Sequence, residues 1–316
     1  MAAIASIGGA LGGCMGCMYF VESLAKEVPS SMNLYTFSSF LFVFLEGLIF
    51  TSKFFTVKNK IPIKGYIPVV SMFFFVNVVN NQALNFHVPV PLHIIFRSGS
   101  LLSTLIMNRL LMGRKYSLKK YLSVIAITIG IIICTLSTKV SSSNESKNKE
   151  SSQKQTELFI GIVMLTVALI ASSILAIFQE KLYKTYGKHP NEAKFVIHGL
   201  SLPIFLFMFN DITTNAKILS STEPIYGIPK AWIDLIGACL LQYVCITFVY
   251  KLNSVTDSLT VTLVVTLRKF LSLLVSIFWF KNPFTTNHWI GALLVFGGTL
   301  VFSEVLGTKK DDKKKN

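Results

Sequence analysis

Three cationic side chains lie inside long apolar runs of this chain. Arg268 and Lys269 are adjacent in VVTLRKFLSLLVS (264–276), and Arg97 follows PLHIIF in a second run. A charge at the centre of a membrane-spanning helix costs roughly 2.5–3.5 kcal/mol, so cations kept there normally bind or move something. Arginine offers paired N–H donors that match the oxygens of phosphate or carboxylate. These residues therefore favour binding of an anion within a membrane.

The composition indicates that these runs are membrane-spanning helices. Of 316 residues, 52% are hydrophobic and 14% are charged, whereas a soluble domain carries about 25% charged residues. The apolar residues come in blocks of about 20, the length that crosses a bilayer as a helix. We predict an all-α polytopic membrane protein with ten transmembrane helices. The ten predicted spans are 4–25, 33–52, 66–86, 92–112, 119–137, 158–180, 195–210, 231–250, 256–280 and 286–306.

The distribution of basic residues predicts the orientation of these spans. With a cytosolic N-terminus, 18 of the 30 Lys and Arg residues fall in cytosolic segments, eight fall on the opposite side and four lie inside spans. Basic residues favour the cytosolic side, so both termini are expected there. The net charge of +15 thus reflects topology, and no nucleic-acid partner is expected. Lys313 and Lys314, near the C-terminus, resemble a dilysine retrieval signal of the endoplasmic reticulum or Golgi membrane. An ordinary basic tail is the alternative.

The chain is expected to form a single transmembrane transporter domain (1–316) with two halves, about 1–137 and 158–306. Tyr116 is followed after five residues by Tyr121, and the same interval separates Phe284 from Trp289. Gly130 follows nine residues after Tyr121, and Gly298 follows nine residues after Trp289. Five helices per half is an odd number, so the second half would be inverted relative to the first, a transporter architecture.

Two polar segments flank or separate these halves. The low-complexity loop 138–157 is expected to be disordered and lumenal. It contains the glycosylation sequon Asn144-Glu145-Ser146. The segment 307–316 is expected to be a cytosolic basic tail.

Other patterns that might carry chemistry are weak. The five cysteines all lie in apolar spans and are expected to be packing residues. The spacing of Gly8, Gly12 and Gly16 suits close contact between membrane helices. The motifs D-x-D, H-E-x-x-H, G-x-S-x-G and G-x-G-D do not occur, so we expect no enzyme, no metal and no cofactor.

An intramembrane ion pair is the alternative explanation for the three cations. The acids that could supply it are Glu22, Glu46 and Glu180. Three cations near one interface outnumber the acids expected close by, whereas a polyanionic ligand would neutralise them together. The residues alone therefore favour a site for a phosphorylated metabolite.

Three blocks of the sequence resemble one transporter family. They are MFFFVNVVNNQALNFHVPVPLHIIFRSGSLLSTLI (72–106), IFQEKLYKTYGKHPNEAKFVIHGLSLPIFLF (177–207) and VTLVVTLRKFLSLLVSIFWF (261–280). Together they resemble nucleotide-sugar transporters of the drug/metabolite transporter superfamily, of the UDP-N-acetylglucosamine/UDP-xylose type. The resemblance implies a central cavity and exchange of a cytosolic UDP-sugar for lumenal UMP by alternating access. The chain departs from these relatives at residues 195–198, which read Phe-Val-Ile-His where relatives often read Phe-Tyr-Asn-His.

The resemblance also assigns site residues. It implies that Lys269 and Arg268, in the ninth helix, and Arg97, in the fourth, contact phosphate. Glu22, in the first helix, is expected to pair with a cation when the cavity is empty. Further substrate or gating candidates are Tyr19, Asn77, Asn80, Asn81, His93, Gln179 and His198. For the asparagines, hydrogen bonding between helices is the alternative; for the histidines it is packing, and for Tyr19 an interfacial position.

Two other classes of function remain open at this point. One is a transporter of the same superfamily that carries another phosphorylated or organic metabolite. The other is a scaffold or chaperone without transport activity. UDP-sugar, UMP and the lipid bilayer are the expected partners. A homodimer and a retrieval coat bound through the C-terminal lysines are left open.

Overall fold

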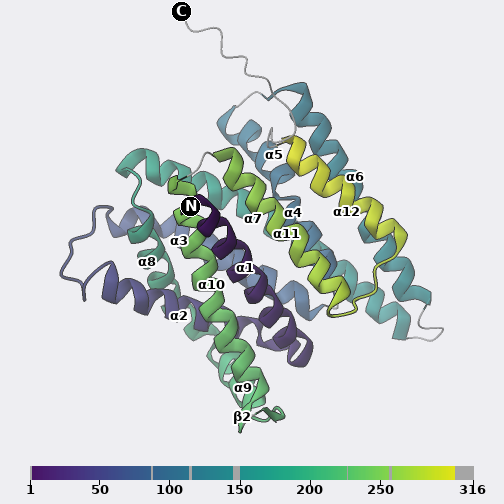
Figure 1. Cartoon of the computed structure of the whole chain (residues 1–316), viewed down its shortest axis with the longest axis horizontal. Helices are drawn as coiled ribbons and strands as arrows, with labels where there is room; N and C mark the ends of the chain where they lie inside the picture. Colours follow the sequence, from purple (N-terminus) through teal and green to yellow (C-terminus); the bar gives the residue numbers. More distant parts are fainter. Residues whose placement is uncertain are drawn as a thin grey trace, which may run out of the picture.

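The computed structural model describes residues 2–86, 88–113, 116–144, 150–225, 227–255 and 258–302, and almost all of them are helical (Figure 1). The predicted tail 307–316 and two residues of the sequon, Glu145 and Ser146, lie outside the described residues. The fold is that of an all-α polytopic membrane protein.

Most of the described elements follow one another with short connections, and residues 51–62 form a longer one between the second and third helices. The helices are α1 (Ala2–Glu27), α2 (Met32–Phe50), α3 (Ile63–Asn85), α4 (Val90–Ser98), α5 (Ser100–Met112), α6 (Leu118–Asn144), α7 (Glu150–Tyr186), α8 (Pro190–Ser201), α9 (Phe209–Ser220), α10 (Lys230–Val255), α11 (Ser258–Phe278) and α12 (Thr286–Phe302). Two 3-10 helices, η1 (Pro29–Ser31) and η2 (Leu202–Met208), and a two-stranded hairpin of β1 (Pro224–Ile225) and β2 (Ile228–Pro229) complete the described elements.

Eight helical stretches of the described chain are long and apolar enough to cross a membrane. They are Ala5–Glu27, Pro29–Phe50, Ile63–Asn85, Val90–Leu111, Leu118–Thr138, Thr156–Tyr186, Pro190–Ser220 and Lys230–Val249. The two remaining predicted spans coincide with α11, which carries Arg268 and Lys269, and with α12, an apolar helix of 17 residues. Eight of the ten predicted spans are therefore confirmed as candidate membrane helices by length and composition.

The polar loop predicted at 138–157 is helical wherever the structure describes it. α6 continues to Asn144 and α7 begins at Glu150, so the expectation of disorder is wrong for these residues. Extending an existing helix costs far less than starting a new one, and both segments extend helices that are anchored in the bundle.

Two of the spans are interrupted helices. α4 and α5 meet at Gly99, where an added Cβ atom would lie 2.4 Å from Cδ1 of Ile131 in α6. Glycine allows this close approach without displacing the Ile131 side chain, and the break lies two residues after Arg97. The span Pro190–Ser220 is interrupted by the 3-10 segment η2, which contains Pro203. Proline lacks the N–H that an α-helix needs at that position.

Glycines bring two pairs of helices into close contact. An added Cβ atom on Gly130 of α6 would lie 2.6 Å from the carbonyl oxygen of Gly291 in α12, and one on Gly291 would lie 2.6 Å from that of Gly130. α6 and α12 accordingly lie side by side in Figure 1. Small residues permit such packing between membrane helices.

The glycines at the contact between α1 and α10 differ from those predicted. Gly9, Gly13 and Gly16 face Phe248, Val244 and Leu241 of α10, whereas Gly8 and Gly12 have no described atom within 4 Å of an added Cβ. The prediction is thus wrong for Gly8 and Gly12. The pairs 8/12 and 9/13 have the same spacing, and spacing alone does not tell which stripe of a helix meets its neighbour.

The main helix contacts can be compared between the two predicted halves by replacing each span with the span five places later or earlier in the chain. Most of the contacts then correspond to other contacts of the structure. The exchange replaces α1 by α7, α2 by α8 and α9, α3 by α10, α4 and α5 by α11, and α6 by α12. The contact of α1 with α10 then becomes that of α7 with α3, and the contact of α1 with α11 becomes that of α7 with α5. The pairs α6–α12, α2–α8 and α4–α11 map onto themselves.

Two of the cysteines form a disulfide. Cys14 of α1 is bonded to Cys245 of α10, and Cys17, Cys134 and Cys239 are free and buried. The prediction that all five are packing residues is therefore wrong for this pair. Residues 231 positions apart give no local signal of their proximity.

The first prediction concerns neighbouring glycines of α12. A Cβ atom on Gly298 would lie 2.9 Å from the backbone oxygen of Ser123, whereas one on Gly297 has no described atom within 4 Å. Gly298→Ala should lower the midpoint of thermal unfolding, since overpacking of this kind costs about 1–3 kcal/mol. Gly297→Ala should leave the midpoint unchanged or raise it, because alanine favours helix. Unfolding of both variants in detergent tests this, and equal midpoints would contradict the packing described.

The second prediction concerns the disulfide. Unfolded protein kept without reductant should react with a thiol reagent at three cysteines, and at five after reduction. Mass spectrometry of the labelled chain gives the count. Five labels before reduction would show that Cys14 and Cys245 are not bonded.

Candidate functional site

The three cations singled out in the sequence lie together. Arg97 is on α4 and Arg268 and Lys269 are on α11, and these two helices pack against each other. The ammonium nitrogen of Lys269 donates a hydrogen bond to the backbone oxygen of Arg97 at 3.3 Å. The positive charges of all three are within electrostatic range of one another. We call these three residues the cationic cluster.

The cationic cluster is accessible, although Arg268 and Lys269 lie midway along α11 and Arg97 lies in the last turn of α4. The side chain of Arg97 is exposed, while its neighbours Phe96 and Ser98 are buried. Arg268 and Lys269 are half-buried. One face of α4 and the facing part of α11 can therefore meet a ligand without unpacking either helix.

The two cations of α11 point in different directions. Neighbouring residues of an α-helix are about 100° apart around its axis. Lys269 faces α4, whereas a guanidinium nitrogen of Arg268 lies 3.4 Å from Sγ of Cys14 and 3.3 Å from Sγ of Cys245. Arg268 thus borders the contact between α1 and α10, and the cluster presents charge toward several helices.

Two of the acids considered as ion-pair partners are engaged elsewhere. Glu46 lies 3.3 Å from the ammonium of Lys194 and accepts a hydrogen bond from Tyr243. Glu180 pairs with Lys184, one turn along α7, at 2.7 Å.

Glu22, the third acid, joins α1 to the end of α11. Its buried carboxylate accepts hydrogen bonds from the hydroxyl of Ser276 and the amide of Asn282. Next to it, the ammonium of Lys26 donates to the backbone oxygen of Phe280 at 2.6 Å. In this conformation Glu22 holds the end of α1 to the end of α11, and its carboxylate forms no ion pair within the described part of the chain.

Among the residues that the structure describes, no acid consequently balances the charge of the cationic cluster. Within the ranges that the structure describes, no carboxylate is at ion-pair distance from Arg97, Arg268 or Lys269. An ion pair with Glu22, Glu46 or Glu180 therefore does not explain the three cations here. The arrangement suits a ligand that brings more than one negative charge.

His93 is the secondary candidate that lies next to the cluster. It precedes Arg97 by one helical turn, is buried, and is within electrostatic range of the Arg97 guanidinium. Its Nε2 atom has no hydrogen-bond partner among the described residues. The structure thus places His93 beside the cationic cluster.

The three asparagines of α3 serve packing in this conformation. Asn77 and Asn80 donate to backbone oxygens of α3 itself. Asn81 donates to α2 at distances of 2.7 to 3.2 Å. Its acceptors are the backbone oxygen of Met32, Oδ1 of Asn33 and Oγ1 of Thr36. The alternative of a hydrogen bond between helices is correct for Asn81.

The other secondary candidates lie apart from the cluster. His198 donates a hydrogen bond through Nδ1 to the backbone oxygen of Lys194, and its ring meets the rings of Phe40 and Phe73 edge-on. Tyr19 packs in an aromatic group near the end of α11. Gln179 is half-buried on α7. Val196 and Ile197, which stand where relatives often have Tyr and Asn, are buried.

A polar group that the sequence analysis missed faces the cluster from other helices. The sulfur of Cys17 in α1 contacts the hydroxyl of Tyr35 in α2 at 3.7 Å and Oε1 of Gln242 in α10 at 3.2 Å. Tyr35 is also within electrostatic range of Arg97. Tyr35 comes early in its span, where an aromatic residue ordinarily marks the membrane surface, so its sequence position did not single it out.

The fold and the cationic cluster define a multi-pass membrane carrier of an anionic solute. The chain belongs to the UAA transporter family, which matches residues 2–306. It is therefore a nucleotide-sugar transporter, as the resemblance of its sequence predicted, and membership of a transporter family indicates that it is not an enzyme.

Several curated proteins are similar over almost the whole chain. The endoplasmic reticulum GDP-fucose transporter of Drosophila melanogaster is 47% identical over 95% of this chain and 89% of its own length. The UDP-xylose and UDP-N-acetylglucosamine transporter of Danio rerio is 43% identical over 94% of this chain and 92% of its own. The nucleotide sugar transporter SLC35B4 of Homo sapiens is 42% identical over 98% and 97%.

The third prediction separates a binding cation from a structural one. Lys269→Ala should leave the midpoint of thermal unfolding unchanged or raise it, because it removes a like charge and breaks no ion pair. Lys230→Ala should lower the midpoint, because Lys230 bonds the carboxylates of Glu27 and Asp234. Purified variants unfolded in detergent provide the measurement. If both substitutions destabilise equally, Lys269 has a structural role instead.

Proposed function

We propose that this chain is an antiporter that imports a UDP-sugar into the lumen of the endoplasmic reticulum or Golgi in exchange for UMP. UDP-N-acetylglucosamine is the favoured substrate and UDP-xylose the second. The observation that carries the proposal is the cationic cluster, which has no carboxylate partner among the described residues and is accessible to a ligand. The names of the relatives support the class of substrate.

Phosphate is the part of the substrate that the cluster would bind. Lys269 and Arg97 lie together at the crossing of α4 and α11, and Arg268 lies beside them. A diphosphate can take charge-assisted hydrogen bonds from all three residues. UMP also carries phosphate, so substrate and counter-substrate would neutralise the same charges.

Exchange follows if the empty protein changes conformation slowly. Without a ligand, three positive charges repel one another in an apolar bundle, and moving helices around them is costly. A ligand lowers this cost only if it binds more tightly to the intermediate conformations than to the inward-facing and outward-facing states. Both nucleotide sugar and UMP would do so, and each would enable the return of the protein after the other has left.

The helix contacts support alternating access by two inverted halves, 1–137 and 158–306. The main contacts of α1 recur for α7 when the spans are exchanged, and α4 packs on α11 where the halves would meet. The contact of Glu22 with Ser276 and Asn282 would then close the lumenal end, with both termini in the cytosol. Opening that end requires these hydrogen bonds to break, which gives Glu22 a gating role.

GDP-fucose is a second candidate substrate. One relative, 47% identical over 95% of this chain, is named a GDP-fucose transporter. The cationic cluster would serve either nucleotide, because both carry a diphosphate. Discrimination between uracil and guanine must then come from uncharged groups around the cluster, for which His93, Tyr35 and Gln242 are the candidates.

The fourth prediction tests the substrate directly. Liposomes containing the purified protein are preloaded with UMP, GMP or no nucleotide and offered labelled UDP-N-acetylglucosamine, UDP-xylose and GDP-fucose. We expect uptake of UDP-N-acetylglucosamine that depends on internal UMP. Lys269→Ala should abolish it, while Lys217→Ala, an exposed lysine of α9, should retain it.

Three outcomes would contradict this assignment. Uptake of GDP-fucose that depends on internal GMP would replace the UDP-sugar by the second candidate. Unchanged uptake by Lys269→Ala would refute the role of the cationic cluster. Absence of uptake of every nucleotide sugar, with folded protein, would favour a different anionic metabolite.

A further inference from the structure

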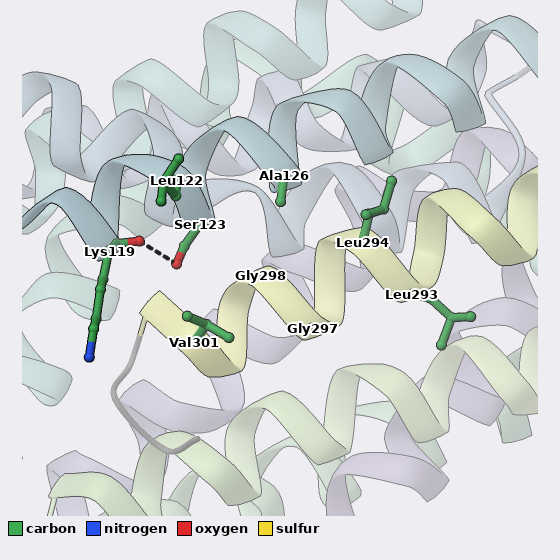
Figure 2. Close-up of a pocket in the computed structure, with 9 residues that line it drawn as sticks. All are labelled: Lys119, Leu122, Ser123, Ala126, Leu293, Leu294, Gly297, Gly298 and Val301. Atoms are coloured by element: carbon green, nitrogen blue, oxygen red, sulfur yellow. Dashed lines mark hydrogen bonds between the residues drawn. The ribbon is translucent and has the colours of Figure 1, made fainter. Parts of the chain in front are cut away.

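A groove runs along the outside of the bundle between α6 and α12 (Figure 2). Its volume is about 380 Å³, and it lies outside the cationic cluster. Figure 2 shows that its lining residues come from both helices, with Gly297 and Gly298 of α12 among them. Apolar residues of the walls are Leu122, Ala126, Leu294 and Val301.

The groove opens on the outer surface of the bundle, and its lining is mostly apolar. Leu122 is 57% exposed and Val301 is 40% exposed, as expected for side chains that face hydrocarbon. The hydroxyl of Ser123, on the groove wall, already donates to the backbone oxygen of Lys119 at 2.8 Å. An apolar chain therefore suits the groove better than a polar metabolite does.

One end of the groove carries a positive charge. Lys119 lines this end and its side chain is exposed, extending past the rim in Figure 2. Lys120 follows it and lies over the rings of Tyr116 and Phe302. Basic residues beside a groove between membrane helices are typical of sites for anionic lipid headgroups. In the predicted orientation this end lies at the cytosolic surface, where anionic lipids are concentrated.

We propose that the groove between α6 and α12 binds an anionic phospholipid, with an acyl chain along the apolar walls and the phosphate on Lys119. Gly297 makes room for the chain, because a side chain at this position would have no described protein atom within 4 Å and would instead enter the groove. The lipid would cover the outer side of the α6–α12 contact.

Charge favours a lipid over a second copy of this chain. Two copies related by a twofold axis through this groove would use the same surface on both sides. Their Lys119 side chains would then approach each other at one apolar interface, which is unfavourable. A lipid phosphate neutralises the same lysine.

The fifth prediction uses phosphatidylserine and phosphatidylcholine as probes. Delipidated protein in detergent is mixed with each lipid, and bound lipid is counted by native mass spectrometry. Wild-type protein should retain phosphatidylserine preferentially. Gly297→Leu should lose both lipids, because its side chain fills the groove, whereas Gly8→Leu, at an equally open glycine of α1, should retain them.

Lys119→Gln separates the headgroup from the acyl chain. It should bind phosphatidylserine about fivefold more weakly, the contribution of one basic residue near an anionic surface, and bind phosphatidylcholine as before. Lys181→Gln, at an exposed lysine of α7, is the matched control. Unchanged phosphatidylserine retention in Gly297→Leu, or equal retention of both lipids by wild type, would overturn the proposal. So would conversion of a two-copy species into single chains by Gly297→Leu without loss of lipid, which would make the groove an interface between copies.

Discussion

The structure depends on the electrostatic cost of three positive charges inside an apolar bundle. Arg97, Arg268 and Lys269 meet where α4 packs on α11, and the acids that could neutralise them are bonded to other groups. Such an arrangement is stable only if solvent or a ligand reaches the charges. The accessible surface of Arg97 is a consequence of this constraint, and the proposed binding of a polyanionic ligand rests on it as well.

Other helices of the bundle pack closely against one another. α6 contacts α12, and α1 contacts α10, through glycines that leave little room for side chains. A disulfide additionally joins α1 to α10. Tightly packed pairs tend to move as units, so conformational change is expected where polar contacts join helix ends. The hydrogen bonds of Glu22 to Ser276 and Asn282, at the end of α11, are polar contacts of this type.

Much of the fold and part of the site could be predicted from local features. The length of an apolar block determines whether it spans a membrane, and a cation inside such a block is conspicuous because it is costly. The four-residue spacing of Gly8 and Gly12 was less informative. The same spacing occurs at Gly9 and Gly13, and only the packing of α1 on α10 shows that the second pair is used.

The sequence by itself determined the class of protein, eight candidate membrane spans and the cations that meet in the bundle. The tertiary structure decided the partners of those residues. It bonds Glu22 to Ser276, which is 254 residues away, and places Tyr35 within electrostatic range of Arg97. The physical reason is that apolar length and charge are properties of one segment. A hydrogen bond or disulfide depends on the relative rotation of two helices, and sequence spacing within one helix does not specify it.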